Sequence, residues 1–211
     1  MKKTIGFAIY PVFCLSPIAF LLAQVSVNPE RWIIAPVLYF ILIAIVLLLE
    51  SLLPWSVEWN QPKGDLGLDL KHLAGNLMVS HVALLIYFVV FNYRGLLFDR
   101  GLSDFDVITQ YVVALLVFDF GLYIVHRLSH GSDILWRLHA IHHSSERIYS
   151  INGQKRHLLH EILEGLPGLV VLWMLGVRPE AVALTIATVS IHLLLQHANI
   201  DYRVGPVGRF L

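Results

Sequence analysis

The sequence predicts an all-α integral membrane protein with four long transmembrane helices, a later helical hairpin and a histidine-rich helical cap on the cytoplasmic side. Hydrophobic residues make up 57% of its 211 residues, and charged residues make up only 14%. A soluble domain carries about 25% charged residues. The charges also gather in short segments between long apolar runs, which is typical of multi-pass membrane proteins.

Four apolar runs each have the roughly 20 residues that a helix needs to cross a bilayer. They are Thr4–Gln24, Trp32–Leu53, Leu73–Tyr93 and Val107–Val125. The first run contains two prolines and lacks a clear small-residue cleavage pattern, so we interpret it as a membrane helix rather than a cleaved signal peptide. Two shorter runs, Leu166–Val177 and Ala181–Leu195, are separated by Arg178-Pro179 and predict a helical hairpin.

The distribution of basic residues predicts the orientation of these helices. With the N-terminus in the cytoplasm, the outer segments hold only four of the fifteen Lys and Arg residues: Arg31, Arg94, Arg100 and Arg178. The inner segments hold the other eleven: Lys2, Lys3, Lys63, Lys71, Arg127, Arg137, Arg147, Lys155, Arg156, Arg203 and Arg209. This bias places segment 126–165, and most of the histidines, on the cytoplasmic side.

Charge, length and cysteine content limit the partners, domains and cofactors that this chain can have. Fifteen basic and fifteen acidic residues cancel, so no global field attracts nucleic acid, and we expect no nucleic-acid partner. We expect a single membrane domain over residues 1–211, with apolar transmembrane helices in 1–106 and a histidine-bearing catalytic part in 107–211. The one cysteine, Cys14, excludes an intrachain disulfide and an iron–sulfur cluster held by four thiolates.

Five histidines follow one another closely at the end of the fourth apolar run. His126 and His130 have the i, i+4 spacing that puts two side chains on one helix face, within reach of one metal ion. Gly131 is expected to end this helix, and Ser132 or Asp133 to cap the next one. On that next helix, we expect one face to carry His139, His142 and His143. The five imidazoles therefore predict a metal site at the membrane surface.

Four later histidines are more ambiguous. His197 ends the last apolar run at the same predicted depth as the first five and is a further candidate ligand. His192 precedes it by five residues, so on a regular helix it faces elsewhere and is a weaker candidate. His157 and His160 lie in a polar segment, where contact with lipid headgroups is the simpler interpretation.

A ligating imidazole normally needs a hydrogen-bond acceptor on its other nitrogen. Asp119 lies seven residues before His126, on the same helical face and inside an apolar run, where an acid is costly and usually functional. We expect Asp119 to accept a hydrogen bond from a ligand ring, so that Asp119→Asn lowers metal occupancy in a folded protein. Further candidates for this role are Asp133, Glu146, Glu161 and Glu164.

The stretch Asp119 to Glu146, with HRLSH and LWRLHAIHHSSE, and the later HAN resemble the fatty acid hydroxylase/sterol desaturase superfamily, whose histidine boxes hold two irons. The resemblance covers residues 115–211, and residues 1–110 share only apolar helices with the family. It implies metal ligation by His126, His130, His139, His142, His143 and His197. The family's last HxxHH box follows the hairpin and is absent from this sequence, so we expect a fragment of a longer protein or a truncated form.

The resemblance implies an O2-dependent di-iron hydroxylase or desaturase that acts on a C–H bond of a fatty acyl or sterol-like lipid taken from the bilayer. Protein side chains alone cannot activate O2, so the two irons, which zinc can replace on purification, supply that chemistry. Without a visible flavin, haem or iron–sulfur motif, the electrons are expected from a separate donor protein. Either such a donor or anionic lipids could contact Arg127, Arg137, Arg147, Lys155 and Arg156.

Three alternatives compete with this interpretation. A membrane zinc hydrolase also uses histidines, but HExxH is absent and the histidines exceed what one zinc needs. A metal transporter would place its ligands at mid-membrane rather than at the surface. A truncated family member could act as a non-catalytic, metal-binding membrane protein. Iron content and O2-dependent product formation separate these functions.

Overall fold

Long apolar segments in a bilayer must satisfy their backbone hydrogen bonds internally, and this chain does so with helices. The computed structural model describes residues 2–61, 63–96 and 101–204, which form helices and loops with one isolated β-bridge, between Pro54 and Ile200. Six helical segments of the described chain can cross a membrane: Gly6–Val27, Pro29–Leu52, Leu66–Phe91, Val107–Gly131, Leu158–Leu175 and Pro179–Gln196. The predicted all-α membrane fold, with four spans and a later hairpin, is confirmed.

Prolines shape the first two spans. Helix α1 (Lys2–Tyr10) continues through a π-helical turn, Pro11–Leu15, into α2 (Ser16–Val27). Pro11 has no N–H to donate, and a local widening of the helix accommodates that loss without a break. A 3-10 turn, Pro29–Ile33, then leads into α3 (Ile34–Leu52).

Two of the later helices begin earlier than their apolar runs predict. Helix α4 (Leu66–Phe91) begins seven residues before Leu73, and α7 (Leu158–Leu175) begins eight residues before Leu166. The added turns carry polar side chains that point into the protein, including the fully buried Asp69 of α4. Its carboxylate accepts a hydrogen bond from the Tyr149 hydroxyl at 2.7 Å. Burial with a partner is compatible with a helix, so the polar residues extend the helices rather than end them.

The predicted hairpin consists of α7 and α8 (Pro179–Gln196), joined by a tight turn. Gly176 has φ of 72°, the left-handed conformation that commonly ends helices and that glycine adopts without steric cost. Pro179 occupies the first turn of α8, where its missing N–H costs nothing. The backbone N–H of Arg178 donates to the Gln110 side chain at 2.8 Å, which ties the turn to α5 (Val107–Gly131).

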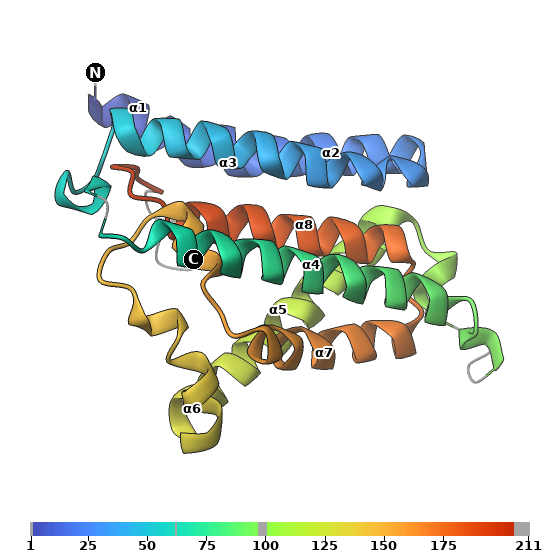
Figure 1. Cartoon of the computed structure of the whole chain (residues 1–211). Helices are drawn as coiled ribbons and strands as arrows, with labels where there is room; N and C mark the ends of the chain where they lie inside the picture. Colours follow the sequence, from blue (N-terminus) through green and yellow to red (C-terminus); the bar gives the residue numbers. More distant parts are fainter. Residues whose placement is uncertain (1, 62, 97–100, 205–211) are drawn as a thin grey trace.

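The helices form three layers, in which α1–α2 and α3 lie above α4 and α8, and α5 and α7 lie below (Figure 1). Helix α8 is the central element, because α2, α3, α4 and α5 all pack against it. Helices α5 and α7 approach closely where Gly121 faces Gly168, and a Cβ on Gly121 would lie 3.1 Å from the Gly168 nitrogen. Small residues at such crossings let membrane helices pack backbone to backbone.

One end of the bundle is held together by a buried carboxylate. Glu50, near the end of α3, accepts hydrogen bonds from the backbone N–H of Ser150 at 2.7 Å and from that of Asn199 at 2.8 Å. The Asn199 side chain in turn donates to the Ser56 carbonyl and to Asn60, both at 2.8 Å. These hydrogen bonds join the end of α3, a 3-10 turn at Ser150–Gln154 and the segment that follows α8. Short α6 (Asp133–His139) lies at the same end (Figure 1).

Some of the sequence-based expectations lie outside the described residues. They include Arg100 and Arg209 of the charge distribution and the end of the chain from residue 205. The division of the chain into residues 1–106 and 107–211 stays a prediction.

Candidate metal centre

The end of α5 and the short helix α6 bring the histidine boxes together. Helix α5 carries His126 and His130 in its last two turns and ends at Gly131, as predicted. Ser132 then caps α6, accepting a hydrogen bond from the backbone N–H of Leu135 at 3.5 Å. The reversal between the two helices turns His139 back toward α5.

Four imidazoles converge in this bend. The Nε2 atom of His130 lies 3.3 Å from that of His126 and 3.3 Å from that of His139, which lies 3.0 Å from that of His143. All four ligand atoms lie within 4.8 Å of one another. Two nitrogens bound tetrahedrally to one ion at about 2.1 Å would be about 3.4 Å apart, so the spacing fits a shared ion. We call these four residues the histidine cluster.

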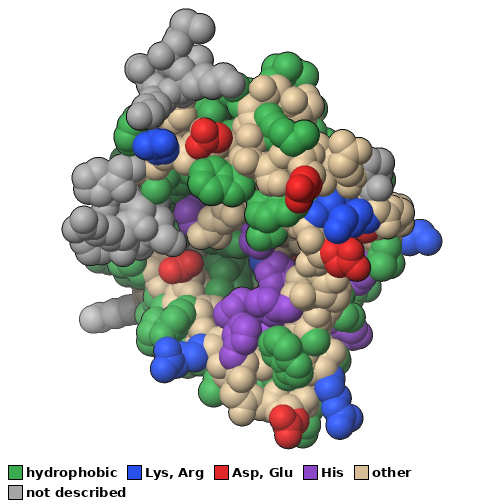
Figure 2. All heavy atoms as spheres, turned by 90° about the vertical axis from the view of Figure 1, so that its left-hand side faces the viewer, with side chains coloured by type: hydrophobic (Ala, Val, Ile, Leu, Met, Phe, Trp, Pro, Cys, Tyr) green, Lys and Arg blue, Asp and Glu red, His purple; other side chains and the backbone are tan. Residues whose placement is uncertain are grey.

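The cluster is buried on one side and open on the other. His139 is only 2% exposed, whereas the His126 side chain is 46% exposed. In the space-filling view, histidines fill a hollow in this end of the molecule (Figure 2). Trp136 stacks on His143 with ring centroids 5.6 Å apart and also contacts His130. The tryptophan thus shields part of the cluster.

Several of these imidazoles lie outside the membrane spans, and burial keeps them in the neutral form that binds metals. It lowers the pKa of His139 to about 4 and the pKa of His142 to about 3. Burial also lowers the pKa of His143 and His197. Because a neutral imidazole nitrogen is the metal ligand, these four rings are ready to bind at neutral pH without first losing a proton.

His142 lies next to the cluster and also faces His197, with the ring centroids of His142 and His197 5.3 Å apart. Helix α6 ends at His139, and a 3-10 turn over His142–Ser144 follows. The expectation that one helix face carries His139, His142 and His143 is therefore wrong, because the helix ends at His139. The His142 ring still lies 5.7 Å from that of His139 and 5.3 Å from that of His143. The Nδ1 atom of His197 bonds to the Leu193 carbonyl at 3.0 Å, which leaves Nε2 as the ring's free acceptor.

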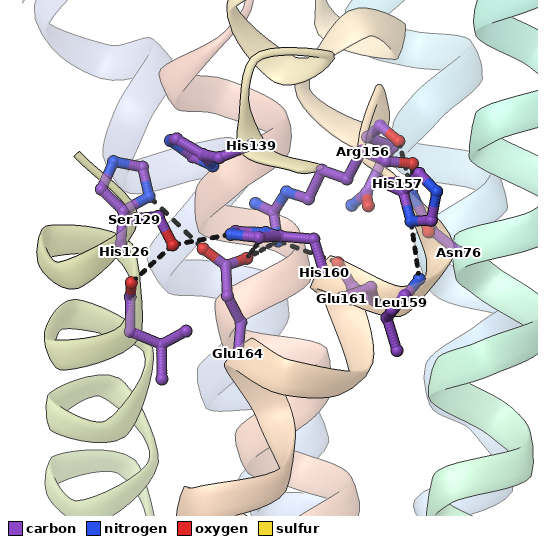
Figure 3. Close-up of polar contacts among 12 residues, drawn as sticks. Asn76, His126, Ser129, His139, Arg156, His157, Leu159, His160, Glu161 and Glu164 are labelled. Atoms are coloured by element: carbon purple, nitrogen blue, oxygen red, sulfur yellow. Dashed lines mark hydrogen bonds and ion pairs between the residues drawn. The ribbon is translucent and has the colours of Figure 1, made fainter. Parts of the chain in front are cut away.

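His160 and Glu164, on α7, form a second grouping with His139 that could hold a metal ion (Figure 3). The Ser129 hydroxyl donates to the Val125 carbonyl at 2.8 Å, so it accepts the Nε2 hydrogen of His160 at 2.9 Å. In neutral His160 the Nδ1 atom is then unprotonated, buried and without a hydrogen-bond partner, 3.6 Å from a Glu164 oxygen. A lone pair and a carboxylate that face each other favour a cation or a proton between them.

His160 is 1% exposed, so the expectation of a headgroup contact is wrong for this residue. The early start of α7 rotates the side chain into the bundle, 4.7 Å from His139 between ring centroids. His157 is partly exposed and caps α7, where its Nδ1 accepts the Leu159 N–H at 3.1 Å. The serine that orients His160, Ser129, was missed by sequence reasoning, and only its i+3 position from His126 hinted at a role.

The carboxylate beside the cluster comes from Glu164, one of the candidates that the sequence offered. Its Oε1 lies 3.4 Å from the His126 Nδ1 atom. Asp119 is exposed on α5 and forms no hydrogen bond or ion pair with a described histidine. Its predicted role stays a prediction. Glu146 pairs instead with Lys63 at the surface, 3.2 Å away.

The structure does not bring His192 to the cluster. Its Nδ1 bonds to the Tyr10 hydroxyl at 2.9 Å, between α8 and α1. Among the described residues, neither grouping that could hold a metal includes it.

Three of the five basic residues expected at a docking surface are buried instead. Arg147 binds Asp65 at 2.7 Å and Lys155 lies 3.4 Å from Asp69. Arg156 binds Glu161 at 3.0 Å and Glu164 at 3.3 Å, and its side chain is only 11% exposed (Figure 3). These charges are paired within the protein, so the docking surface that the sequence predicts rests mainly on the other two residues. Exposed basic residues of that set are Arg127 and Arg137.

Six helices that can span a membrane, with converging histidines at one end, define a multi-pass membrane protein with residues that could hold a metal ion. The sequence model of the fatty acid hydroxylase family matches residues 111–211, which contain every residue of the cluster. The chain belongs to the fatty acid hydroxylase superfamily.

A curated relative supports this assignment. Ornithine lipid hydroxylase OlsE of Rhizobium tropici is 31% identical in an alignment of 184 residues that covers 81% of this chain and 54% of that protein. The chain thus spans about half the length of the relative that it matches. No solved structure matches the chain.

Proposed function

We propose that this chain carries the histidine site of an O2-dependent lipid hydroxylase. The observation that carries the proposal is the convergence of four Nε2 atoms within 4.8 Å at one end of a membrane helix bundle. Membership in the superfamily and a relative named as a lipid hydroxylase support a lipid as the substrate. Hydroxylation is favoured over desaturation because both names refer to hydroxylases.

The metals of this proposal are two irons. The histidine cluster would hold one of them, and the pair of His142 and His197 would contribute to the second. His192 is the weakest of the predicted ligands. When bound, the irons would supply the O2 and redox chemistry that side chains lack.

The protein's own residues hold and orient this site. Glu164, 3.4 Å from His126, would fix the orientation of that ring, as carboxylates beside metal-bound histidines do. Trp136 would limit the access of water to His143, on which it stacks. His139 would be the residue most sensitive to change, because it belongs to both groupings.

Hydroxylation inserts one oxygen atom of O2 into a C–H bond, and the other leaves as water with two electrons and two protons. We propose that a separate donor protein supplies these electrons at the cytoplasmic surface. Exposed Arg127 and Arg137 flank the cluster and would attract an acidic donor.

The test is the metal content of the purified 211-residue chain together with lipid analysis of membranes that contain it, after growth under 18O2. Iron near two per chain and a lipid that gains one 18O atom support the proposal. Zinc with lipid cleavage supports a zinc hydrolase, and metal without any new product supports a non-catalytic metal-binding protein. His139→Ala controls for background activity of the host.

A further inference from the structure

Two segments that meet at the end of α3 determine where the His197 ring lies. One is the Ser150–Gln154 turn, whose Gly153 packs against the ring: a Cβ on Gly153 would lie 2.8 Å from both Cγ and Nδ1 of His197. The other is the segment that carries His197 itself and continues into Asn199, which is fully buried. The position of the ring therefore depends on how these two segments are placed relative to each other.

One side chain, that of Glu50 near the end of α3, binds both segments. Its Oε1 atom accepts the backbone N–H of Ser150 at 2.7 Å and the backbone N–H of Asn199 at 2.8 Å. Its Oε2 atom accepts the Ser150 hydroxyl at 3.1 Å. Glu50 is only 4% exposed, so water cannot readily replace these hydrogen bonds. Glu50 thus fixes the turn that carries Gly153 against the segment that carries His197.

The ring that is held in this way has one nitrogen available for a ligand. Nδ1 of His197 bonds to the Leu193 carbonyl at 3.0 Å, and Nε2 is free. The ring faces His142, with ring centroids 5.3 Å apart. A metal site needs its ligand rings held in orientation, so the groups that fix a ring matter nearly as much as the ring itself.

We propose that Glu50 is a positioning residue that holds His197 in place for metal binding. The inference rests on the proposed function, in which His197 is a metal ligand. Glu50 acts through the backbone of Ser150 and Asn199 rather than by binding the metal. It lies outside residues 111–211, which the family model matches, so the N-terminal apolar helices contribute to the metal centre through this residue.

Three variants separate this role from a general loss of packing. Glu50→Leu keeps much of the side-chain volume but leaves the two backbone N–H groups without their acceptor. Glu50→Gln can place its amide oxygen at the position of Oε1 and keep both bonds, while its NH2 group donates to the Ser150 hydroxyl. Glu58→Leu is the matched control, because Glu58 is exposed at the same end of the bundle.

The test measures how fast each histidine of the full chain reacts with diethyl pyrocarbonate in mild detergent, mapped by mass spectrometry. In metal-free Glu50→Leu we expect His197 to react at least about tenfold faster, because losing the acceptor of a buried N–H favours local opening. His139 and His160, which are at most 2% exposed, should stay protected. Glu50→Gln and Glu58→Leu should react like the unsubstituted chain.

The second arm adds Fe2+ without oxygen. Iron should slow the reaction of His197 in the unsubstituted chain and in Glu50→Gln, but not in Glu50→Leu. If Glu50→Leu does not fold, Glu50→Asp replaces it, because the shorter side chain keeps the charge but draws the carboxylate back from both N–H groups.

Three outcomes overturn the inference: an unchanged reactivity of His197 in the variant, an equal acceleration at His139 and His160, and a lack of protection of His197 by iron in the unsubstituted chain. The proposed function is decided separately, by the lipid product. If His197 behaves as expected and no hydroxylated lipid forms, the role of Glu50 in metal binding stands and the proposed function fails. If lipid is hydroxylated while Glu50→Leu leaves His197 unchanged, only the inference fails.

Discussion

At the scale of single residues, His139 has the central position in the metal centre. It is 2% exposed and its ring lies within 5 Å of the rings of His126, His130, His143 and His160. We predict that His139→Ala lowers metal affinity by more than about 100-fold, beyond the cost of losing a residue that only orients a ligand. The measurement is metal content after dialysis against a graded chelator.

The control for this variant is His81→Ala. His81 is exposed on α4, and its Nδ1 bonds to the carbonyl of Leu77 in its own helix. Equal metal loss in both variants would show that the effect is not specific to the cluster.

Glu164 is predicted to position a ligand ring rather than to bind the substrate. Glu164→Gln removes the charge beside His126 and is expected to lower metal affinity about 10–100-fold. Glu146→Gln, on an exposed carboxylate paired only with Lys63, should change nothing. Asp119→Asn in the same titration tests the sequence-based role for Asp119, and an unchanged affinity would remove that residue from the site.

At the scale of helices, the crossing of α5 and α7 determines where His126 and His160 meet. Gly168 lies against Phe118 of α5, so Gly168→Leu has to push the two helices apart. We predict a loss of about 1–3 kcal/mol of stability, the usual cost of overpacking, together with a lower metal affinity. Thermal unfolding in mild detergent gives the first quantity. Gly165→Ala, three residues away, should leave both quantities unchanged.

The helices themselves were largely predictable, because spans of apolar residues are set by the bilayer. The predictions were wrong where polar residues begin a helix, as in α7, whose first turns contain His160 and Glu164. Hydropathy treats such residues as surface, but here their partners lie on α5 and in the loop before α7. Those partners follow from packing between elements, which residue spacing alone does not reveal.

The candidate site, too, was predictable only in part. The closeness of His126 and His130 was predictable because residues at i, i+4 share a helix face. The position of His143 beside His139 was not, because α6 ends at His139 and His143 lies in the 3-10 turn that follows. The approach of the His142 ring to that of His197 was not predictable either, since His142 lies in the 3-10 turn after α6. The burial of Arg156 was also not predictable from the sequence. Its two carboxylate partners, Glu161 and Glu164, lie in the first turns of α7, which the apolar pattern did not assign to that helix.

At the scale of the whole molecule, the end of α3 with the hydrogen bonds of Glu50 and the histidine groupings near α6 lie at one end of the bundle. The α7–α8 turn lies at the other end (Figure 1). The bias of basic residues predicts that the histidine end faces the cytoplasm. The chain allows a direct test, because Cys14 is its one cysteine and is only 1% exposed. In a Cys14→Ser background, a new cysteine therefore reports its own location.

Glu58→Cys places an exposed thiol at the histidine end, and Asp104→Cys places one at the opposite end, before α5. With a membrane-impermeant maleimide added to intact bacterial spheroplasts, we expect Asp104→Cys to react at once and Glu58→Cys to react only after permeabilisation. The reverse pattern would put the histidines on the outer surface, where a cytoplasmic electron donor could not reach them. Orientation thus decides whether the proposed donor and the proposed site can meet.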